Sequence, residues 1–586
     1  MSTMAPPSLA PAGAARRDEA MRGAWLGARR LRARAATLPA WLLTAALGLF
    51  YVLLAPASSD LAAAGYRSDL FSRVGFTLWD NGWFAGHHLL AYSLLAPPLG
   101  ALLGPQMLGA LSMTAATGLF TLLVRGRFTL RGERLASLWF AFGAGVELFT
   151  NRIPFELGLA VGIGALLAAQ RSPRRDERPR AAIVLLALTL SALCPLASPV
   201  AGAFLALAAL AWALGARRRM PLALACAALL PIVLLAVAFP EGGSEPFVAS
   251  AFYPTLAAVL LLGAALRRRE RILRRGVWLY ALALIACYVL PTPIGGNVDR
   301  LGALLAGPLL VGTLVVQPAG TYVERKHRSQ GARSWLPRGW RAPLLLALAP
   351  LLLYWQVKAP IADYASGSSD RATASSYYKP LLGELSRLGV EYGGGHPARV
   401  EVPPTRDHGE ARWVADAAPL ARGWERQLDV HDDGLFYGHG GPLTAARYRA
   451  WLSRSAVAYV ALADAPLDYS ARAEARLIES GVGYLHEVWS SRHWRLFAVL
   501  TPTPPAQPPS TLTSLGADSF VLHAPRAGTF DVRVRFTPYW SVRAGNGCVQ
   551  RDRGGFTEVR ARAAGTLRVG IDFSLARVFE HGVRCS

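Results

Sequence analysis

Eleven predominantly apolar stretches, separated by short polar segments, fill the first 356 residues of the 586-residue chain. A helix needs about 17–25 apolar residues to cross a bilayer, and these stretches approach that length. After residue 356 apolar and polar positions mix, which predicts a domain outside the bilayer. The predicted spans lie near 38–55, 106–124, 135–150, 153–170, 181–196, 198–215, 220–239, 251–266, 277–291, 299–317 and 342–356.

The basic residues are distributed unevenly between alternate loops. Of the 62 Lys and Arg, 31 lie in the N-terminal tail 1–37 and in the loops 125–134, 171–180, 217–219, 267–275 and 318–341. Residues 357–586 hold 27 of them against 23 Asp and Glu. This is the positive-inside pattern and not a nucleic-acid footprint. It predicts a bacterial plasma-membrane protein with a cytoplasmic basic tail and an extracytoplasmic C-terminal domain.

The segment 56–105 follows the first span and needs a separate interpretation. Its part 87–104 is apolar, but if it crossed the membrane every later basic loop would face outside. Pro97 and Pro98 also interrupt it. We therefore expect a long outer loop with amphipathic or re-entrant helices at the interface, its Trp and Phe side chains anchored among the headgroups.

The transmembrane domain 38–356 is thus followed by two predicted extracytoplasmic units. Strand-like runs at 399–402, 456–462 and 494–500 and a helical stretch at 469–480 indicate an α/β domain over 357–500. The Pro-rich segment 501–510 is linker-like. Alternating runs at 529–536, 556–562 and 565–573 favour a β-sandwich over 511–586. An oxidising exterior permits a disulfide between Cys548 and Cys585, although two unpaired thiols remain an alternative.

Ionisable side chains gather in the loop after the first span. On a helix, Asp69, Arg73 and Asp80 share a face, and His87 and His88 follow. A carboxylate there can deprotonate a hydroxyl, while Arg and His side chains can bind a phosphate leaving group. Alternatively, Asp69 and Arg73 form an i,i+4 ion pair and Asp80 begins a turn.

This layout resembles the GT-C superfamily of membrane glycosyltransferases, which use polyprenyl-phosphate sugars. The closest in arrangement are the actinobacterial arabinofuranosyl- and mannosyltransferases. The resemblance rests on an acidic residue in a long first outer loop, some eleven spans and an exterior C-terminal domain. It implies an inverting transfer to a cell-envelope glycan or lipid acceptor, with Asp69 as general base and Asp80 or Glu156 assisting. Glu147 is a further acidic match in the next outer loop.

Other residues extend this hypothesis. Planar guanidinium groups bind phosphate well, so Arg152 and Arg300 are assigned to binding of the donor phosphate. His87 and His88 are assigned to the same role. A loop rich in aromatic and polar groups contains Trp424, Arg426, Asp429 and Tyr437. It is a candidate glycan-binding site, and the alternative is an ordinary polar loop. The sequence shows no zinc-type spacing and no certain cofactor, and a divalent cation stays open. A non-catalytic scaffold or transporter with a glycan-binding ectodomain is the alternative function.

Overall fold

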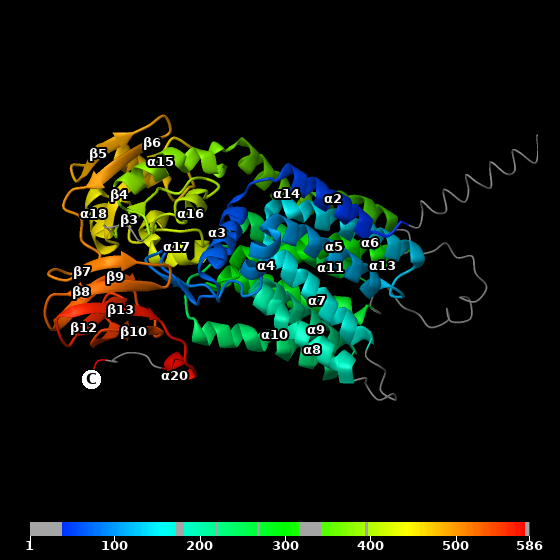
Figure 1. Cartoon of the computed structure of the whole chain (residues 1–586). Helices are drawn as coiled ribbons and strands as arrows, with labels where there is room; N and C mark the ends of the chain where they lie inside the picture. The colour runs from blue at the N-terminus through cyan, green and yellow to red at the C-terminus, as the bar shows by residue number, and fades with distance from the viewer. Residues whose placement is uncertain are drawn as a thin grey trace, which may run out of the picture.

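The computed structural model describes residues 38–171, 181–216, 219–266, 270–315, 341–392, 397–579 and Cys585. The predicted cytoplasmic tail 1–37 lies outside the described residues, as do 172–180, 217–218, 267–269 and 316–340 from the predicted basic loops. Figure 1 shows a bundle of long helices on one side and, beside it, a C-terminal region that contains nearly all the strands.

Every predicted apolar stretch overlaps one long helix of this bundle. Among the described residues, α5, α7, α9, α10 and α12 are long and apolar enough to cross a membrane. The pair α2 and α3, which meet at 79°, adds a sixth candidate if they count as one span. This is compatible with a membrane protein. The bundle helices are α2 (Trp41–Leu54), α5 (Pro105–Val124), α6 (Leu130–Glu147), α7 (Ile153–Arg171), α8 (Ala181–Ala197), α9 (Pro199–Ala216), α10 (Arg219–Ala238), α11 (Ala249–Ala265), α12 (Arg271–Val289), α13 (Arg300–Leu314) and α14 (Arg341–Ser369).

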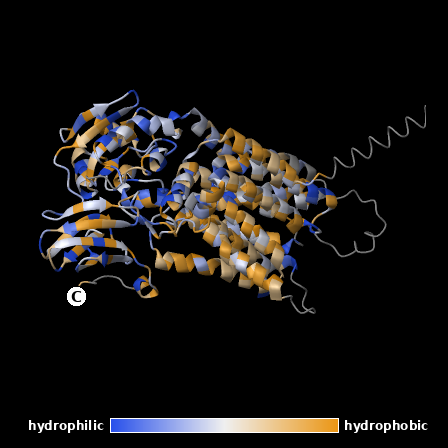
Figure 2. Cartoon of the chain, in the orientation of Figure 1, coloured by the Kyte–Doolittle hydropathy of each residue, from blue (hydrophilic) through white to orange (hydrophobic). Residues whose placement is uncertain are grey.

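Most residues of the bundle helices are apolar (Figure 2), and both buried and exposed positions carry apolar side chains. Small residues allow close helix contacts, as where Gly48 on α2 faces Ala110 on α5. On α10, Leu230, Val233, Leu234 and Val237 are 52–58% exposed. Helices that are apolar all round suit a lipid environment.

The arginine-poor turns all meet the C-terminal region or the first loop. Tyr539 donates a hydrogen bond to the Ala238 carbonyl at the end of α10 (2.5 Å), and Gln427 donates to the Pro293 carbonyl after α12 (3.3 Å). At the opposite end, Thr129 between α5 and α6 bonds to Val315 after α13 (3.0 Å). The turns after α10 and α12 therefore lie at the end of the bundle that meets the C-terminal region, and the turn between α5 and α6 lies at the other end.

The first loop, 56–105, holds α3 (Ser59–Val74), β1 (Trp79–Asp80), β2 (His87–His88) and α4 (Ala96–Leu103). β1 and β2 pair as a short antiparallel hairpin. With eight residues, α4 is about 12 Å long, far less than the roughly 30 Å of a bilayer core. The apolar part of this loop is thus too short as a helix to cross a membrane.

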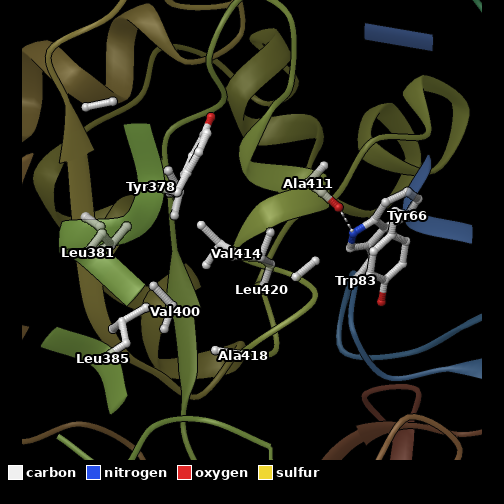
Figure 3. Packing of buried hydrophobic residues seen from close by; sticks show 14 of the residues in the cluster. Tyr66, Trp83, Tyr378, Leu381, Leu385, Val400, Ala411, Val414, Ala418 and Leu420 are labelled. Atoms are coloured by element: carbon white, nitrogen blue, oxygen red, sulfur yellow. Dashed lines mark hydrogen bonds between the residues drawn. The ribbon is translucent and has the colours of Figure 1, made fainter. Parts of the chain in front are cut away.

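The prediction that aromatic side chains of this loop lie among lipid headgroups was wrong for the hairpin. Trp79 and Trp83 are only 2% and 0% exposed. Trp83 enters the core of the C-terminal α/β unit, where its Nε1 donates to the Ala411 carbonyl (2.9 Å; Figure 3). Trp79 enters the β-sandwich core and meets the ring of Trp540 edge-on at 5.8 Å. Contacts with distant chain segments outweighed the interfacial preference of these side chains.

The α/β unit is built on a four-stranded sheet of order β3-β4-β6-β5. β3 is parallel to β4, and the other neighbours are antiparallel. Helices and turns pack around the sheet. These elements are η5 (Arg371–Thr373), α15 (Ser375–Arg387), β3 (Arg399–Glu401), α16 (Glu410–Trp413), α17 (Arg426–Asp432), η6 (Gly434–Tyr437), α18 (Ala445–Arg454), β4 (Val457–Ala463), α19 (Arg472–Glu479), β5 (Leu485–Ser490) and β6 (Trp494–Val499).

Two antiparallel sheets, of orders β10-β13-β8-β7 and β11-β12-β9, follow. Their inward side chains, such as Val532 on β9 and Leu567 on β13, form one core, as alternation along the strands predicts. A disulfide joins Cys548 on β11 to Cys585. The elements are β7 (Thr511–Leu515), β8 (Ser519–Ala524), β9 (Gly528–Arg535), β10 (Trp540–Ala544), β11 (Gly547–Arg551), β12 (Phe556–Ala561), β13 (Gly565–Ile571) and α20 (Leu575–Val578).

Candidate functional site

Charged side chains from several helix ends converge where the bundle faces the C-terminal region. Arg152, between η1 (Leu148–Thr150) and α7, lies at their centre. Its Nε is 3.5 Å from Asp60 Oδ2 and its Nη1 is 3.3 Å from Glu147 Oε1. Arg300 is within electrostatic reach of all three. We call this group the polar cluster; its members are Asp60, Glu147, Arg152, Asp299, Arg300 and Asp363.

Local structure explains why Asp60 lies there. The Ser58 side chain caps α3 by accepting a hydrogen bond from the Leu61 amide (3.3 Å). Asp60 therefore falls in the first turn, where the helix dipole favours a carboxylate. Its side chain is 28% exposed, so one face remains open beside Arg152.

The cluster contains more carboxylates than guanidinium groups, and this affects how its members titrate. Burial lowers the pKa of Arg152, but Glu147, Asp60, Asp363 and Asp299 outweigh it and hold that pKa above its usual value. Burial raises the pKa of Asp363 to about 6. The cluster thus combines two guanidinium groups with four carboxylates, of which Asp363 has its pKa raised toward neutrality.

Arg300 begins α13 directly after η2 (Gly295–Asp299). Its Nη2 donates a short hydrogen bond to Asn297 Oδ1, and its guanidinium stands 5.5 Å from the centre of the Phe155 ring. Its Nε has no hydrogen-bond partner among the described residues. A partly buried guanidinium with an unused donor is suited to bind an anion.

An apolar groove begins beside Arg300. It has a volume of about 180 Å³ and runs between α9, α11, α12 and α13. Leu301 and Gly302 line it, and the Gly302 amide donates to the hydroxyl of Tyr280 (3.1 Å). That hydroxyl in turn donates to the Val298 carbonyl and so holds η2 in place (2.9 Å). One end of the groove thus lies next in the chain to Arg300 of the polar cluster, and its lining is apolar apart from the Tyr280 hydroxyl.

Glu156 lies one turn beyond Arg152 on α7 and is fully buried. Neither carboxylate oxygen has a hydrogen-bond partner among the described residues. Oε2 faces Gly109 on α5 so closely that a β-carbon there would collide with it. Glu156 therefore lies under the polar cluster but does not point into open space.

The other residues predicted in the first loop lie elsewhere. Asp69 pairs with Arg412 on α16 (3.0 Å), and burial raises its pKa despite this partner. Asp80 is fully buried, accepts hydrogen bonds from Tyr66 and the Gly82 amide (both 2.9 Å), and has its pKa raised to about 6 by burial. Asp69 thus ties the loop to the C-terminal region, whereas Asp80 bonds within the loop and joins the hairpin to α3.

The two histidines also belong to the hairpin attachment. His87 stacks on Trp83 (5.5 Å), and burial lowers its pKa to about 3. His88 lies between Glu241, 2.5 Å from its Nδ1, and Thr537, 2.9 Å from its Nε2. Neither ring reaches the polar cluster, so the structure separates them from Arg152 and Arg300.

The predicted glycan-binding residues do meet, but mainly one another. Arg426 binds Asp468 through two nitrogens (2.8 and 3.0 Å) and Tyr437 through Nη1 (2.7 Å). Tyr437 donates to Asp429 (2.5 Å), and Trp424 stacks on His408 at 3.6 Å. These polar groups satisfy each other, which leaves few free to hold a sugar.

Glu245 joins this network to the polar cluster. It lies in the loop between α10 and α11, and burial raises its pKa to about 7, while Arg426 and Arg300 oppose the rise. Tyr469, 55% exposed, stands beside Arg426, whose guanidinium is 4.8 Å from its ring centre. The C-terminal region therefore faces the polar cluster across Glu245.

Sequence reasoning assigned no role to five residues of this arrangement: Asp60, Arg67, Glu245, Asp299 and Asp363. Arg67 on α3 is 3% exposed, pairs with Glu425 (2.7 Å) and lies 4.0 Å from the ring centre of Tyr92. Ser58 before Asp60 is a helix-capping signal directly after an apolar stretch, and it could have identified Asp60. No comparable signal marks Glu245.

Among the described residues, no group of three or more His, Cys, Asp or Glu side chains is placed to hold a metal ion. No protein-family model matches the chain, and no curated protein matches it in sequence.

Proposed function

We propose that the chain is a polytopic glycosyltransferase of the bacterial plasma membrane. In this proposal the eleven bundle helices are spans, the N-terminus is cytoplasmic and the C-terminal region is extracytoplasmic. The segregation of helix ends and the arginine distribution support that topology. The shorter helices α2 and α13 are compatible with it, because a bilayer thins around short spans.

The observation that carries the proposal is that Arg152, Arg300 and Asp60 lie together, and that Arg300 directly precedes Leu301 and Gly302, which line the apolar groove. A polyprenyl-phosphate sugar has complementary parts: an apolar tail, a phosphate and a reactive glycosidic carbon. The groove suits the tail, and the two guanidinium groups suit the phosphate. The sugar would then lie between the polar cluster and the C-terminal region, where Glu245 and Tyr469 meet it.

The reaction follows from these roles. Asp60 accepts the proton of an acceptor hydroxyl while the oxygen of that hydroxyl attacks the anomeric carbon of the donor sugar. The bond between that carbon and the phosphate oxygen breaks, and polyprenyl phosphate leaves with the bonding electrons. Arg152 and Arg300 stabilise the negative charge that develops on the phosphate. Transfer therefore inverts the anomeric centre, and the acceptor is a cell-envelope glycan or lipid.

We assign the base to Asp60 rather than Asp69. Asp69 is engaged by Arg412, whereas Asp60 lies beside both guanidinium groups of the cluster. Glu156, which is buried one turn beyond Arg152, keeps an assisting role in this proposal. The proposal thus keeps the first-loop carboxylate that the GT-C resemblance implies but places it at the start of α3.

The test compares Asp60→Asn with Asp69→Asn in membranes that hold equal amounts of folded protein. With a polyprenyl-phosphate sugar donor, Asp60→Asn should lower the transfer rate about 10²–10⁴-fold, because an amide cannot take the proton. Asp69→Asn, which removes an ion pair on the same helix, should keep most activity. The reverse order would return the base to Asp69. No turnover by the wild type with any such donor would favour the scaffold function.

A further inference from the structure

Two large apolar side chains stand out from the C-terminal region just after β13. Phe573 is 48% exposed and Leu575, the first residue of α20, is 75% exposed. Single exposed apolar residues are common on protein surfaces. These two, however, lie in one short segment, which includes α20 at the edge of the β-sandwich (Figure 1).

This segment lies at the end of α10. The rings of Phe573 and Phe239, the residue after α10, are 6.1 Å apart. Val578 packs against the small core that contains Phe239 and Tyr539. The exposed apolar surface of α10, which extends to Val237, therefore continues onto residues 573–578.

Hydrogen bonds and an ion pair fix this segment to the β-sandwich. Arg577 donates to the Asp572 carbonyl (2.9 Å) and the Tyr539 carbonyl (3.2 Å) and pairs with the Asp572 carboxylate (2.9 Å). Further along the chain, the disulfide ties Cys585 to Cys548. The charged groups of the segment thus turn toward the protein. Phe573 contacts the rings of Phe239 and Tyr539 on one side and keeps about half of its surface exposed, and Leu575 is largely exposed.

We propose that residues 573–578 insert into the outer-leaflet interface of the membrane and anchor the β-sandwich there. The partner is a lipid surface, because the apolar side chains continue the surface of a helix that the proposed function places in the bilayer. Aromatic and aliphatic groups at that depth bury their apolar area among acyl chains, as monotopic segments do. The inference rests on the proposed membrane position of α10.

The experiment measures depth with a nitroxide label at Leu575→Cys in the full chain reconstituted into vesicles of phosphatidylcholine and phosphatidylglycerol. Cys226 and Cys287 are first replaced by Ser, whereas Cys194 is buried and remains. Leu234→Cys on α10 is the lipid reference. Val488→Cys on β5, 44% exposed and far from α10 in Figure 1, is the aqueous reference. Frequent collision of the nitroxide with oxygen indicates that the label lies in lipid, and frequent collision with a water-soluble nickel chelate indicates that it lies in water.

We expect the oxygen-to-nickel ratio at position 575 to exceed that at 488 at least threefold and to approach that at 234. A ratio at 575 equal to that at 488, with 234 in lipid, refutes the anchor and leaves the proposed topology intact. Low collision rates with both reagents at 575 would mean that protein covers the segment, which also refutes the anchor. A water-exposed label at 234 refutes the topology and the anchor together.

Discussion

Replacing Trp83 tests whether the first loop is built into the C-terminal region. The indole is fully buried and stacks on Tyr66 with ring centres 4.6 Å apart. Its Nε1 donates to the Ala411 carbonyl, and Arg67 stands 5.0 Å from its ring centre. Trp83→Ala removes all these contacts at once. Phe76→Ala is the matched control, because Phe76 belongs to the same loop but is 60% exposed.

The magnitude follows from burial. Removing a fully buried Trp side chain costs about 3–5 kcal/mol, and the loss includes the hydrogen bond to the Ala411 carbonyl. For 150–250 residues, each kcal/mol shifts the melting temperature by about 2–4 °C. Trp83→Ala should therefore lower the unfolding temperature of the C-terminal region by about 6–20 °C. The Phe76→Ala change should stay within about 0.5 kcal/mol, as for most surface positions.

The assay is thermal unfolding of the full chain in detergent micelles, with circular dichroism following loss of the strand signal. Limited proteolysis below the transition provides a second readout, because an undocked hairpin exposes residues 75–90 to cleavage. Equal unfolding temperatures for Trp83→Ala and Phe76→Ala would show that the hairpin does not enter the C-terminal core. The reasoning from burial would then fail.

Two further predictions concern the C-terminal region. Burial raises the pKa values of Asp433 and Glu474 to about 7, so the stability they contribute is complete below about pH 4 and is lost as pH rises through 7. The unfolding temperature should therefore fall between pH 6.5 and 8, a range above that in which titration of His87 raises stability with pH. Glu474→Gln should make the unfolding temperature depend less on pH. A rise in unfolding temperature over this range would contradict the raised pKa values. Cys585→Ser should lower stability by about 2–4 kcal/mol, since the disulfide closes a chain separation of 37 residues. Peptide mapping without reductant should recover the Cys548–Cys585 pair in the wild type, and free thiols at both positions would exclude it.

The positions of the bundle helices could be predicted because their signal is local. A helix that faces lipid or other apolar helices is apolar all round, so its sequence shows it whatever its neighbours are. The β-sandwich strands were also visible, because alternation along 529–536 corresponds to alternate burial along β9. How many helices span the membrane depends on length as well, and α13, with 15 residues, is shorter than the roughly 17–25 residues of a usual span.

The attachment of the first loop could not be predicted because its partners are distant. Trp83 and Ala411 are separated by 328 residues, and Trp79 meets Trp540 still further along the chain. An aromatic residue beside an apolar stretch has the same local pattern whether it lies in headgroups or in a protein core. Only the folded arrangement distinguishes the two. Asp60 was not considered from the sequence, because its neighbours Arg152 and Arg300 are likewise distant in the chain.

The central claim is that the polar cluster binds the phosphate of a lipid-linked donor above the apolar groove. A cryo-electron microscopy structure of the full chain in lipid nanodiscs with added polyprenyl phosphate tests it most directly. The account predicts phosphate density within about 3 Å of the Arg152 and Arg300 guanidinium nitrogens, as charge-assisted hydrogen bonds require, and tail density along Leu301 and Tyr280. Phosphate density at another place, with Arg152 and Arg300 still bound only to protein groups, would contradict it.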